Sequence, residues 1–189
     1  MQKNIIISGV GGQGILTMAS IIDLAAMNLG LNVKQAEVHG MSQRGGAVES
    51  HLRISSEEIF SDLIPLGKAD LILSIEPMEA LRYLPFLSPD GVIVTATEPY
   101  INIGNYPDEN ALLDAIAASG KHVFVHAGSL AKEAGSAKAY NVVMLGAASP
   151  YLDIEVGELE NAIRQLFSRK GEEIVNMNLK AFRLGLANI

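Results

Sequence analysis

The sequence predicts an α/β fold, in which a doubly wound, mostly parallel sheet lies between two layers of helices. Apolar runs of strand length alternate with stretches of helical spacing along the chain. Several of these runs, such as IIIS and LILSI, are apolar at consecutive positions, which is typical of parallel strands that are covered on both faces. A length of 189 residues is enough for one core, so we expect a single domain over residues 1–189.

Six segments have the length and composition of strands. One of them, residues 47–54, alternates between Val48, Ser50, Leu52 and Ile54 on one side and polar residues on the other, which predicts a half-exposed edge strand or an interface strand. The six predicted strands are residues 4–9, 32–38, 47–54, 70–75, 91–95 and 122–126.

Helical spacing follows the first predicted strand and returns near the end of the chain. Apolar residues recur at helical spacing over residues 15–29, and Gly30 is a suitable stop. Pro77 fits the first position of a second helix, where its missing N–H costs nothing. Two further helices are predicted over residues 155–168 and 172–186.

The composition excludes several classes of function. Fourteen basic residues against 21 acidic ones give a net charge of -7, so nucleic acid is not an expected partner. The absence of cysteine excludes disulfides, thiol nucleophiles and Cys-ligated iron–sulfur clusters. No apolar stretch reaches the roughly 20 residues that span a membrane, and no signal-peptide pattern is present, so we expect a cytoplasmic protein with no membrane partner. A hydrophobic content of 49% with only five Phe, five Tyr and no Trp is compatible with an apolar surface that meets another subunit, but composition alone does not establish one.

Gly9, Gly11 and Gly14 follow the first predicted strand with the GxGxxG spacing of a dinucleotide-binding turn. Such a turn is followed, about 20 positions later, by an acidic residue that binds a ribose hydroxyl, and Glu37 stands near that distance. The alternative is that the glycines serve close packing, and that the turn faces another anion or a neighbouring chain. The pattern alone leaves both interpretations open.

Two features favour the second interpretation. Gln13 places a side chain that can donate and accept hydrogen bonds at the mouth of the helix. A single domain also leaves no second domain to hold a hydride donor or acceptor against a nicotinamide. A dehydrogenase is therefore the weaker hypothesis, and we expect no tight binding of NAD, NADP or FAD.

A second glycine loop follows the second predicted strand and is the most distinctive segment of the chain. It contains Ser42, Gln43 and Arg44, followed by Gly45 and Gly46. Arginine offers a planar fork of donors that suits carboxylate or phosphate, which predicts contact with an anionic ligand or a partner subunit. A solvated surface turn is the alternative.

The sequence offers no self-contained catalytic site. His122 and His126 lie on one predicted strand, about 13 Å apart, and cannot bind one metal ion together. The nucleophile elbow, the phosphate loop and the HExxH zinc helix are all missing. Glu76 and Glu79 are most simply explained by the first turn of a helix, where negative charge is favoured.

Four motifs resemble one family over nearly the whole chain: GVGGQG, EVHGMSQRGG, EPMEALR and GEEIVNMNLKAFRLG. They resemble the gamma-type subunit of the 2-oxoacid:ferredoxin oxidoreductases, and most closely the free-standing subunit of the enzymes that use indolepyruvate. The resemblance implies a Rossmann-like fold similar to domain III of pyruvate:ferredoxin oxidoreductase.

The resemblance implies an enzyme that oxidatively decarboxylates a 2-oxoacid with coenzyme A and passes the electrons to ferredoxin. Thiamine diphosphate, Mg²⁺ and [4Fe-4S] clusters are expected in a large alpha subunit, so this chain is expected to bind no cofactor alone and to be noncatalytic. Neither a cysteine nor a GDG motif for the diphosphate is present. The 2-oxoacid stays open among indolepyruvate, pyruvate and others, and an independent nucleotide-binding protein is the second hypothesis.

The resemblance also suggests what the two glycine loops do. In related enzymes this domain lies near the path by which coenzyme A approaches the thiamine. The residues expected to contact a ligand or the partner are Gly9, Gly11, Gly12, Gln13, Gly14, Ser42, Gln43, Arg44, Gly45 and Gly46.

Overall fold

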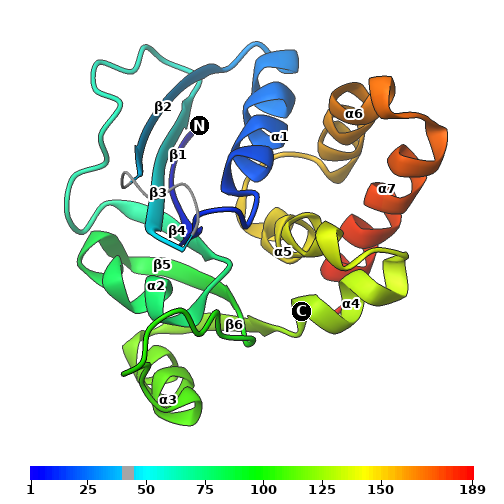
Figure 1. Ribbon diagram of the computed structural model, residues 1–189. Helices are drawn as coiled ribbons and strands as arrows, with labels where there is room; N and C mark the ends of the chain where they lie inside the picture. The colour runs from blue at the N-terminus through cyan, green and yellow to red at the C-terminus, as the bar shows by residue number, and fades with distance from the viewer. Residues whose placement is uncertain (40–44) are drawn as a thin grey trace.

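The computed structural model describes residues 1–39 and 45–189, and within these residues six strands form one sheet (Figure 1). The strand order is β2-β3-β1-β4-β5-β6. All six predicted strands are present, with small differences at their ends. Their bounds are β1 Gln2–Val10, β2 Asn32–His39, β3 Ala47–Ser55, β4 Ala69–Ser74, β5 Leu87–Ala96 and β6 Lys121–Val125.

The sheet is mostly parallel, as predicted. β1, β4, β5 and β6 pair with one another in parallel. β3 is antiparallel to both of its neighbours, β1 and β2. The carboxyl ends of β1, β4, β5 and β6 therefore meet at one edge, where open α/β sheets usually bind ligands.

Of the two alternatives predicted for residues 47–54, the half-exposed edge strand is wrong, and the interface strand stays a prediction. β3 lies inside the sheet between β2 and β1, and β2 takes the edge position. The polar side of β3 is covered by the connection to β4: His51 Nδ1 accepts a hydrogen bond from the backbone N of Ile64 (3.1 Å), and Arg53 donates to the carbonyl of Ser61 (2.8 Å). The alternation of polar and apolar residues in β3 is therefore explained by hydrogen bonds to the connection that covers the strand, and not by exposure to water.

The helices predicted from the sequence are all present. α1, Ile15–Asn28, begins directly after the glycine turn, and α2, Pro77–Arg82, has its proline in the first turn. α6, Val156–Phe167, and α7, Glu172–Ala187, are the two C-terminal helices. The further helices are α3 Glu109–Ser119, α4 Ala127–Ala134 and α5 Tyr140–Ala148, and the short 3-10 helices are η1 Leu84–Phe86, η2 Ala137–Ala139, η3 Ser149–Tyr151 and η4 Ser168–Lys170.

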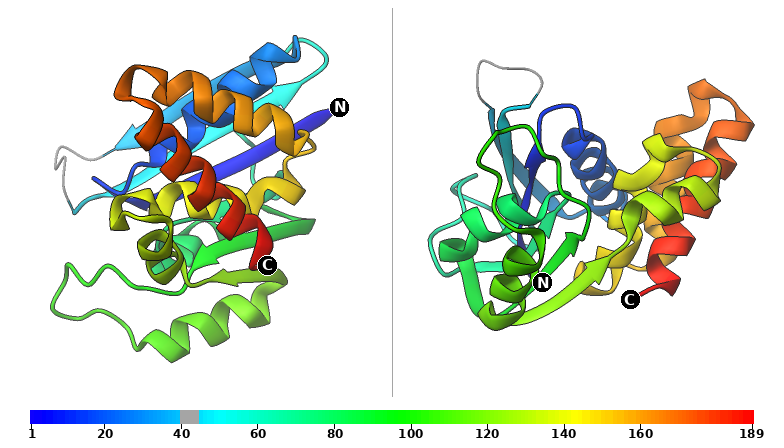
Figure 2. Two further views of the ribbon diagram at one scale, coloured as in Figure 1. Left: turned by 90° about the vertical axis from the view of Figure 1, so that its right-hand side faces the viewer. Right: turned by 60° about the horizontal axis from the view of Figure 1, so that its bottom comes forward.

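Helices cover both faces of the sheet, and the two coverings differ in depth (Figure 2). On one face α1 and α5 contact the strands, α6 packs against α1, and α4 and α7 pack against α5. On the other face α2 contacts the strands and α3 packs beside it. We call the first the thick face and the second the thin face.

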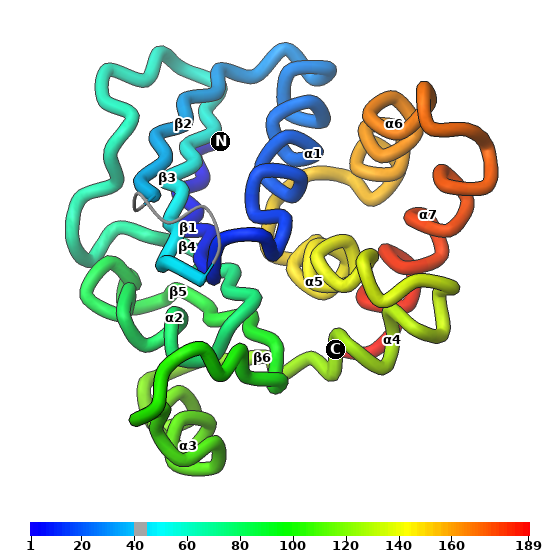
Figure 3. Tube along the Cα trace, in the orientation of Figure 1, coloured from blue at the N-terminus to red at the C-terminus, as the bar shows by residue number. Residues whose placement is uncertain are grey.

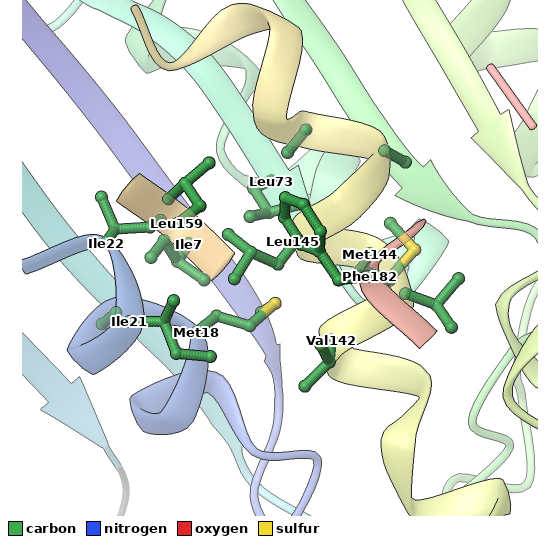
Figure 4. Close-up of a cluster of buried hydrophobic side chains, with 14 of the residues drawn as sticks. Ile7, Met18, Ile21, Ile22, Leu73, Val142, Met144, Leu145, Leu159 and Phe182 are labelled. Atoms are coloured by element: carbon green, nitrogen blue, oxygen red, sulfur yellow. The ribbon is translucent and has the colours of Figure 1, made fainter. Parts of the chain in front are cut away.

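The main apolar core lies on the thick face (Figure 4). Ile7 of β1, Met18 of α1, Leu145 of α5, Leu159 of α6 and Phe182 of α7 belong to one cluster, and all are fully buried. The thin face has two smaller clusters, centred on Ile72 and Ile93. In the part of the chain that the structure describes, no helix has both the length and the apolar character that crossing a membrane requires.

Two glycines allow α5 and α7 to lie unusually close together. A Cβ atom on Gly146 would lie 2.0 Å from the carbonyl oxygen of Phe182, and one on Gly185 would lie 1.9 Å from that of Val143. No side chain fits into either space, so the two helix backbones are in direct contact.

Candidate functional site

The first glycine turn connects β1 to α1 at the carboxyl edge of the sheet (Figure 3). Gly14 caps α1 in the left-handed conformation (φ 80°), and a Cβ atom there would lie 2.4 Å from Nδ2 of Asn141. That amide group donates a hydrogen bond to the carbonyl of Gly14 (3.1 Å). The positive φ therefore favours glycine at this position, and the absence of a Cβ atom leaves room for the Asn141 amide.

The side chain of Gln13 folds back over the turn. Its Oε1 accepts a hydrogen bond from the backbone N of Val10 (2.7 Å), and a Cβ atom on Gly9 would lie 2.8 Å from this oxygen. The backbone N of Gln13 donates to the carbonyl of Val10 (3.1 Å). Two amides that could face a pyrophosphate are therefore used within the turn.

The described end of the second glycine loop lies against the first turn. Gly11 donates to the carbonyl of Gly46 (2.8 Å), and Gly45 donates to that of Gly11 (3.4 Å). The structure therefore brings together the glycines of both predicted segments. Ser42, Gln43 and Arg44 lie outside the described residues, so their predicted contacts stay predictions.

Glu37 does not occupy the position that a dinucleotide-binding acid would have. In that fold the acid ends the strand next to the first strand, whereas here β3 separates β2 from β1. Glu37 pairs in register with Ser50 of β3, which pairs with Ile7 of β1. The GxGxxG spacing is therefore present, but the strand order that accompanies it in dinucleotide-binding folds is not.

A crevice of about 550 Å³ opens beside the first glycine turn, where the parallel strands end. The side chains of Glu98, Tyr100 and Tyr140 line it, and the Glu98 carboxylate accepts a hydrogen bond from the backbone N of Gly128 (3.0 Å). Gly128 lies in the first turn of α4, so the chain's own carboxylate takes the place that an anion would take at this helix end. Burial, and to a smaller extent the nearby Tyr100, raise the pKa of Tyr140 above its ordinary value. The lining residues of the crevice are Gly11, Gly12, Gln13, Ile75, Ala96, Glu98, Pro99, Tyr100, Ala127, Gly128 and Tyr140.

Two further cavities flank the same turn. One, of about 400 Å³, lies between α1 and the end of β2, where Glu37 and His39 line it together with Leu16. Among the described residues, the Oε2 atom of Glu37 is buried and has no hydrogen-bond partner. The other, of about 670 Å³, lies toward α7 and is lined by Lys138 and Lys170. Glu173 also lines this third cavity, so ionisable side chains of both signs border it.

His126 and Glu76 lie just after the ends of β6 and β4. His126 follows β6, and its Nδ1 lies 2.9 Å from the hydroxyl of Thr97. Across residues 1–39 and 45–189, no group of three or more acidic or histidine side chains is arranged to hold a metal ion. Glu76 caps α2 as predicted, by accepting from the backbone N of Glu79 (2.9 Å).

Several residues of this site carry no signal in the sequence. Asn141, Tyr140 and Glu98 reach the first glycine turn or the crevice from α5 and from the connection after β5. They are far from the glycines along the chain and belong to no motif. The parallel strand order brings them together.

The chain is similar to known proteins over almost its whole length. The sequence model of the family described as pyruvate ferredoxin/flavodoxin oxidoreductase matches residues 4–188. The indolepyruvate oxidoreductase subunit IorB of Archaeoglobus fulgidus is 41% identical over 194 residues, which cover 98% of this chain and 94% of that subunit. The 2-oxoglutarate synthase subunit KorC of the same organism is 27% identical over 184 residues, which cover 97% of this chain and 86% of that subunit.

Solved structures show the same fold. The gamma subunit of a keto/oxoacid ferredoxin oxidoreductase from Geobacter sulfurreducens has a TM-score of 0.72 at 26% identity, over 98% of this chain and 97% of that one. A 2-oxoglutarate:ferredoxin oxidoreductase from Magnetococcus marinus has a TM-score of 0.78 at 26% identity, over 98% of this chain and 30% of that chain. The latter structure has 2-oxoglutarate, coenzyme A and succinyl-CoA bound.

Proposed function

Because this chain belongs to the pyruvate ferredoxin/flavodoxin oxidoreductase family, we propose that it is the noncatalytic subunit of a cytoplasmic indolepyruvate:ferredoxin oxidoreductase. The complete enzyme would convert an aryl 2-oxoacid and coenzyme A to an acyl-CoA and CO₂, and would pass two electrons to ferredoxin. One contrast carries the choice of substrate: identity is 41% to the indolepyruvate subunit of Archaeoglobus fulgidus and 27% to its 2-oxoglutarate counterpart.

The residues of this chain do not fit the cofactors that the family implies. No cysteine is present to ligate an iron–sulfur cluster, and the described residues contain no group of acidic or histidine side chains arranged for a metal ion. Thiamine diphosphate, Mg²⁺ and the [4Fe-4S] clusters are therefore assigned to a larger alpha subunit. No chemical step is assigned to side chains of this chain.

The two glycine loops are proposed to contact coenzyme A or the large subunit. Gly11 and Gly46 are hydrogen-bonded, so the two loops form one continuous surface beside the crevice. Tyr100 lines the same crevice and is 44% exposed, and Ile101 follows it in the chain and is 63% exposed. A surface of this kind suits a partner that covers it permanently.

Reconstitution tests the proposed function. The purified chain is expected to be colourless and inactive toward indolepyruvate, with thiamine diphosphate, Mg²⁺, coenzyme A and an electron acceptor supplied. Adding the large subunit without oxygen should give acyl-CoA and reduced ferredoxin, through a shared surface on the order of 2,000 Å² or more. Activity of this chain alone, or full activity of the large subunit alone, would contradict the proposal, and a panel of 2-oxoacids would show whether pyruvate is preferred.

Arg44→Ala tests the contribution of the second glycine loop. Loss of a charge-assisted contact to an anion or a partner carboxylate should weaken coenzyme A dependence or subunit affinity by about 1.5–3 kcal/mol. The melting temperature of the isolated chain should not change. Arg164→Ala, on the exposed side of α6, is the matched control and should alter neither property. Unchanged turnover and assembly in Arg44→Ala would identify the loop as an ordinary surface turn.

The alternative function is nucleotide binding by the isolated chain, which only the GxGxxG spacing favours. Calorimetric titration with NAD, NADP and FAD separates the two proposals. We expect no binding, and micromolar affinity for any of the three, about -8 kcal/mol, would favour the alternative.

A further inference from the structure

Glu76 has two separate sets of contacts. It follows β4 at the start of α2 and is fully buried. Its Oε2 accepts a hydrogen bond from the backbone N of Glu79 (2.9 Å), which caps the helix. Its Oε1 accepts from the backbone N of Tyr100 (3.4 Å) and from the hydroxyl of Tyr106, both in residues 97–108, the connection between β5 and α3. Capping requires one oxygen, so the second oxygen has a different role.

The type of residue supports this division. Helix caps are usually Ser, Thr, Asp or Asn, whose side chains are shorter than that of glutamate. The additional methylene group of Glu76 allows its carboxylate to reach the cap and the connection together. The Ser74 hydroxyl donates to the carbonyl of Glu76 (2.7 Å) and fixes the backbone from which the side chain extends. Burial, and then the hydrogen bond to Glu76, raise the pKa of Tyr106, which is the direction expected for a hydroxyl that donates to a carboxylate.

The connection that Glu76 holds forms a wall of the candidate site. Glu98, Pro99 and Tyr100 line the crevice. Asn102 donates from its side chain to the carbonyl of Gly45, and the backbone N of Gly45 donates to the carbonyl of Gly11 in the first glycine turn (3.4 Å). A continuous series of contacts therefore runs from the buried carboxylate, through the connection, to both glycine loops.

We propose that Glu76 is a positioning residue that holds residues 97–108 against the glycine loops and so fixes the wall of the crevice. Its carboxylate supplies the acceptor for two donors, Tyr100 and Tyr106, that lie at separate points of the connection. Loss of this acceptor should leave α2 and the sheet in place and should open the connection. The consequence for catalysis rests on the proposed function, whereas the positioning itself concerns only this chain.

Glu76→Asp separates capping from positioning. Aspartate is a good cap, but it is shorter by one methylene group, about 1.5 Å, and cannot reach both Tyr100 and Tyr106 while it caps α2. Hydrogen exchange of the full chain, measured by mass spectrometry, should be about tenfold faster for amides in residues 97–108 and unchanged in β1 and β4. The melting temperature should stay within about 2 °C of the wild-type value.

Tyr106→Phe and Glu79→Gln complete the comparison. Tyr106→Phe removes one of the two donors and should also accelerate exchange in residues 97–108, by a smaller factor. Glu79 lies on the same helix and is also buried, but its carboxylate bonds to Arg82 instead of the connection, so Glu79→Gln is the matched control. Equal exchange in all the variants, or equal opening by Glu79→Gln, would overturn the proposal.

A kinetic measurement on the reconstituted complex extends the test. Glu76→Asp should raise the KM for coenzyme A by about threefold and leave kcat within about twofold, because the crevice wall is displaced while the chemistry lies in the large subunit. A loss of kcat with unchanged KM would contradict positioning. If the wild-type complex is inactive, the proposed function fails, and hydrogen exchange alone decides the role of Glu76.

Discussion

The thick and thin faces of the sheet are held by different interactions. On the thick face the helices share one large apolar cluster, and α5 and α7 touch through Gly146 and Gly185. On the thin face the apolar clusters are small, and buried acids make defined contacts: Glu76 with Tyr100 and Tyr106, and Glu79 with Arg82.

Acids with buried carboxylate oxygens show the same difference. Glu76 and Glu79 have donors for both carboxylate oxygens. Asp23 on α1 and Glu37, which faces the cavity beside α1, each leave one buried oxygen without a hydrogen-bond partner among the described residues. Apolar area can stabilise the thick face despite such defects, whereas the thin face uses its paired acids to orient the connection that borders the crevice.

The largest effect is expected where the helix backbones touch on the thick face. Gly146→Ala should destabilise the chain by about 3 kcal/mol, because the new methyl group would lie 2.0 Å from the carbonyl oxygen of Phe182 and would force α5 and α7 apart. This corresponds to a fall in Tm of about 6–12 °C in thermal unfolding. Gly157→Ala on α6, where nothing lies within 4 Å, should leave stability unchanged or raise it by up to about 1 kcal/mol. Equal effects of the two substitutions would contradict close packing as the source of stability.

An intermediate effect is expected from the paired acids of the thin face. Arg82→Ala would remove the guanidinium that donates to Glu79 at 2.8 and 3.2 Å and would leave a buried carboxylate without it. Because Arg82 itself is 52% exposed, we expect a loss of about 2 kcal/mol in urea unfolding rather than the larger cost of a fully buried pair. Arg183→Ala breaks an exposed pair with Glu160 on the thick face and should cost below about 1 kcal/mol. A reversed order would show that burial does not decide the strength of these pairs.

The smallest effect is expected from Asp23, and it depends on pH. Burial raises the pKa of Asp23 from 3.8 to about 7, so the folded state binds a proton that the unfolded state has already lost between these two values. Stability should therefore fall as the pH rises through this range, and Asp23→Asn should remove this dependence. The variant should gain roughly 1 kcal/mol over the wild type for the step from pH 5 to pH 6 in urea unfolding, because a difference of one bound proton over one pH unit is worth about 1.4 kcal/mol.

The difference in stability between the wild type and Asp23→Asn also separates the contribution of Asp23 from that of His51, whose pH dependence falls in an overlapping range. Burial lowers the pKa of His51, so its contribution to stability is lost as the pH falls below 6.5, the opposite direction. His51 is present in both proteins, and its effect cancels in the difference. A difference that does not change with pH would show that Asp23 keeps its charge in the folded state.

Local pattern alone determined the strands, the first helix, the helix at Pro77 and the two C-terminal helices. Consecutive apolar residues, a glycine stop and a proline at a first turn act over a few positions, and these signals are complete in the sequence. α5 was not predicted because Asn141 to Ala148 are buried on every side, which removes the periodicity that marks a helix. The same limit applies to β3, whose alternating residues predict an edge until the connection to β4 covers them.

Only the tertiary structure decided how the site is assembled. The sequence supplied the glycine loops, but the insertion of β3 between β1 and β2 decided that Glu37 does not serve the first turn as in a dinucleotide fold. The tertiary structure also brought Asn141 to Gly14 and Tyr106 to Glu76. In each pair, helices and strands separate the two residues along the chain. Strand order is set by the burial of whole helices and strands against one another, which is the sum of many weak contacts. The residues that these contacts bring together therefore carry no local sequence pattern that would predict it.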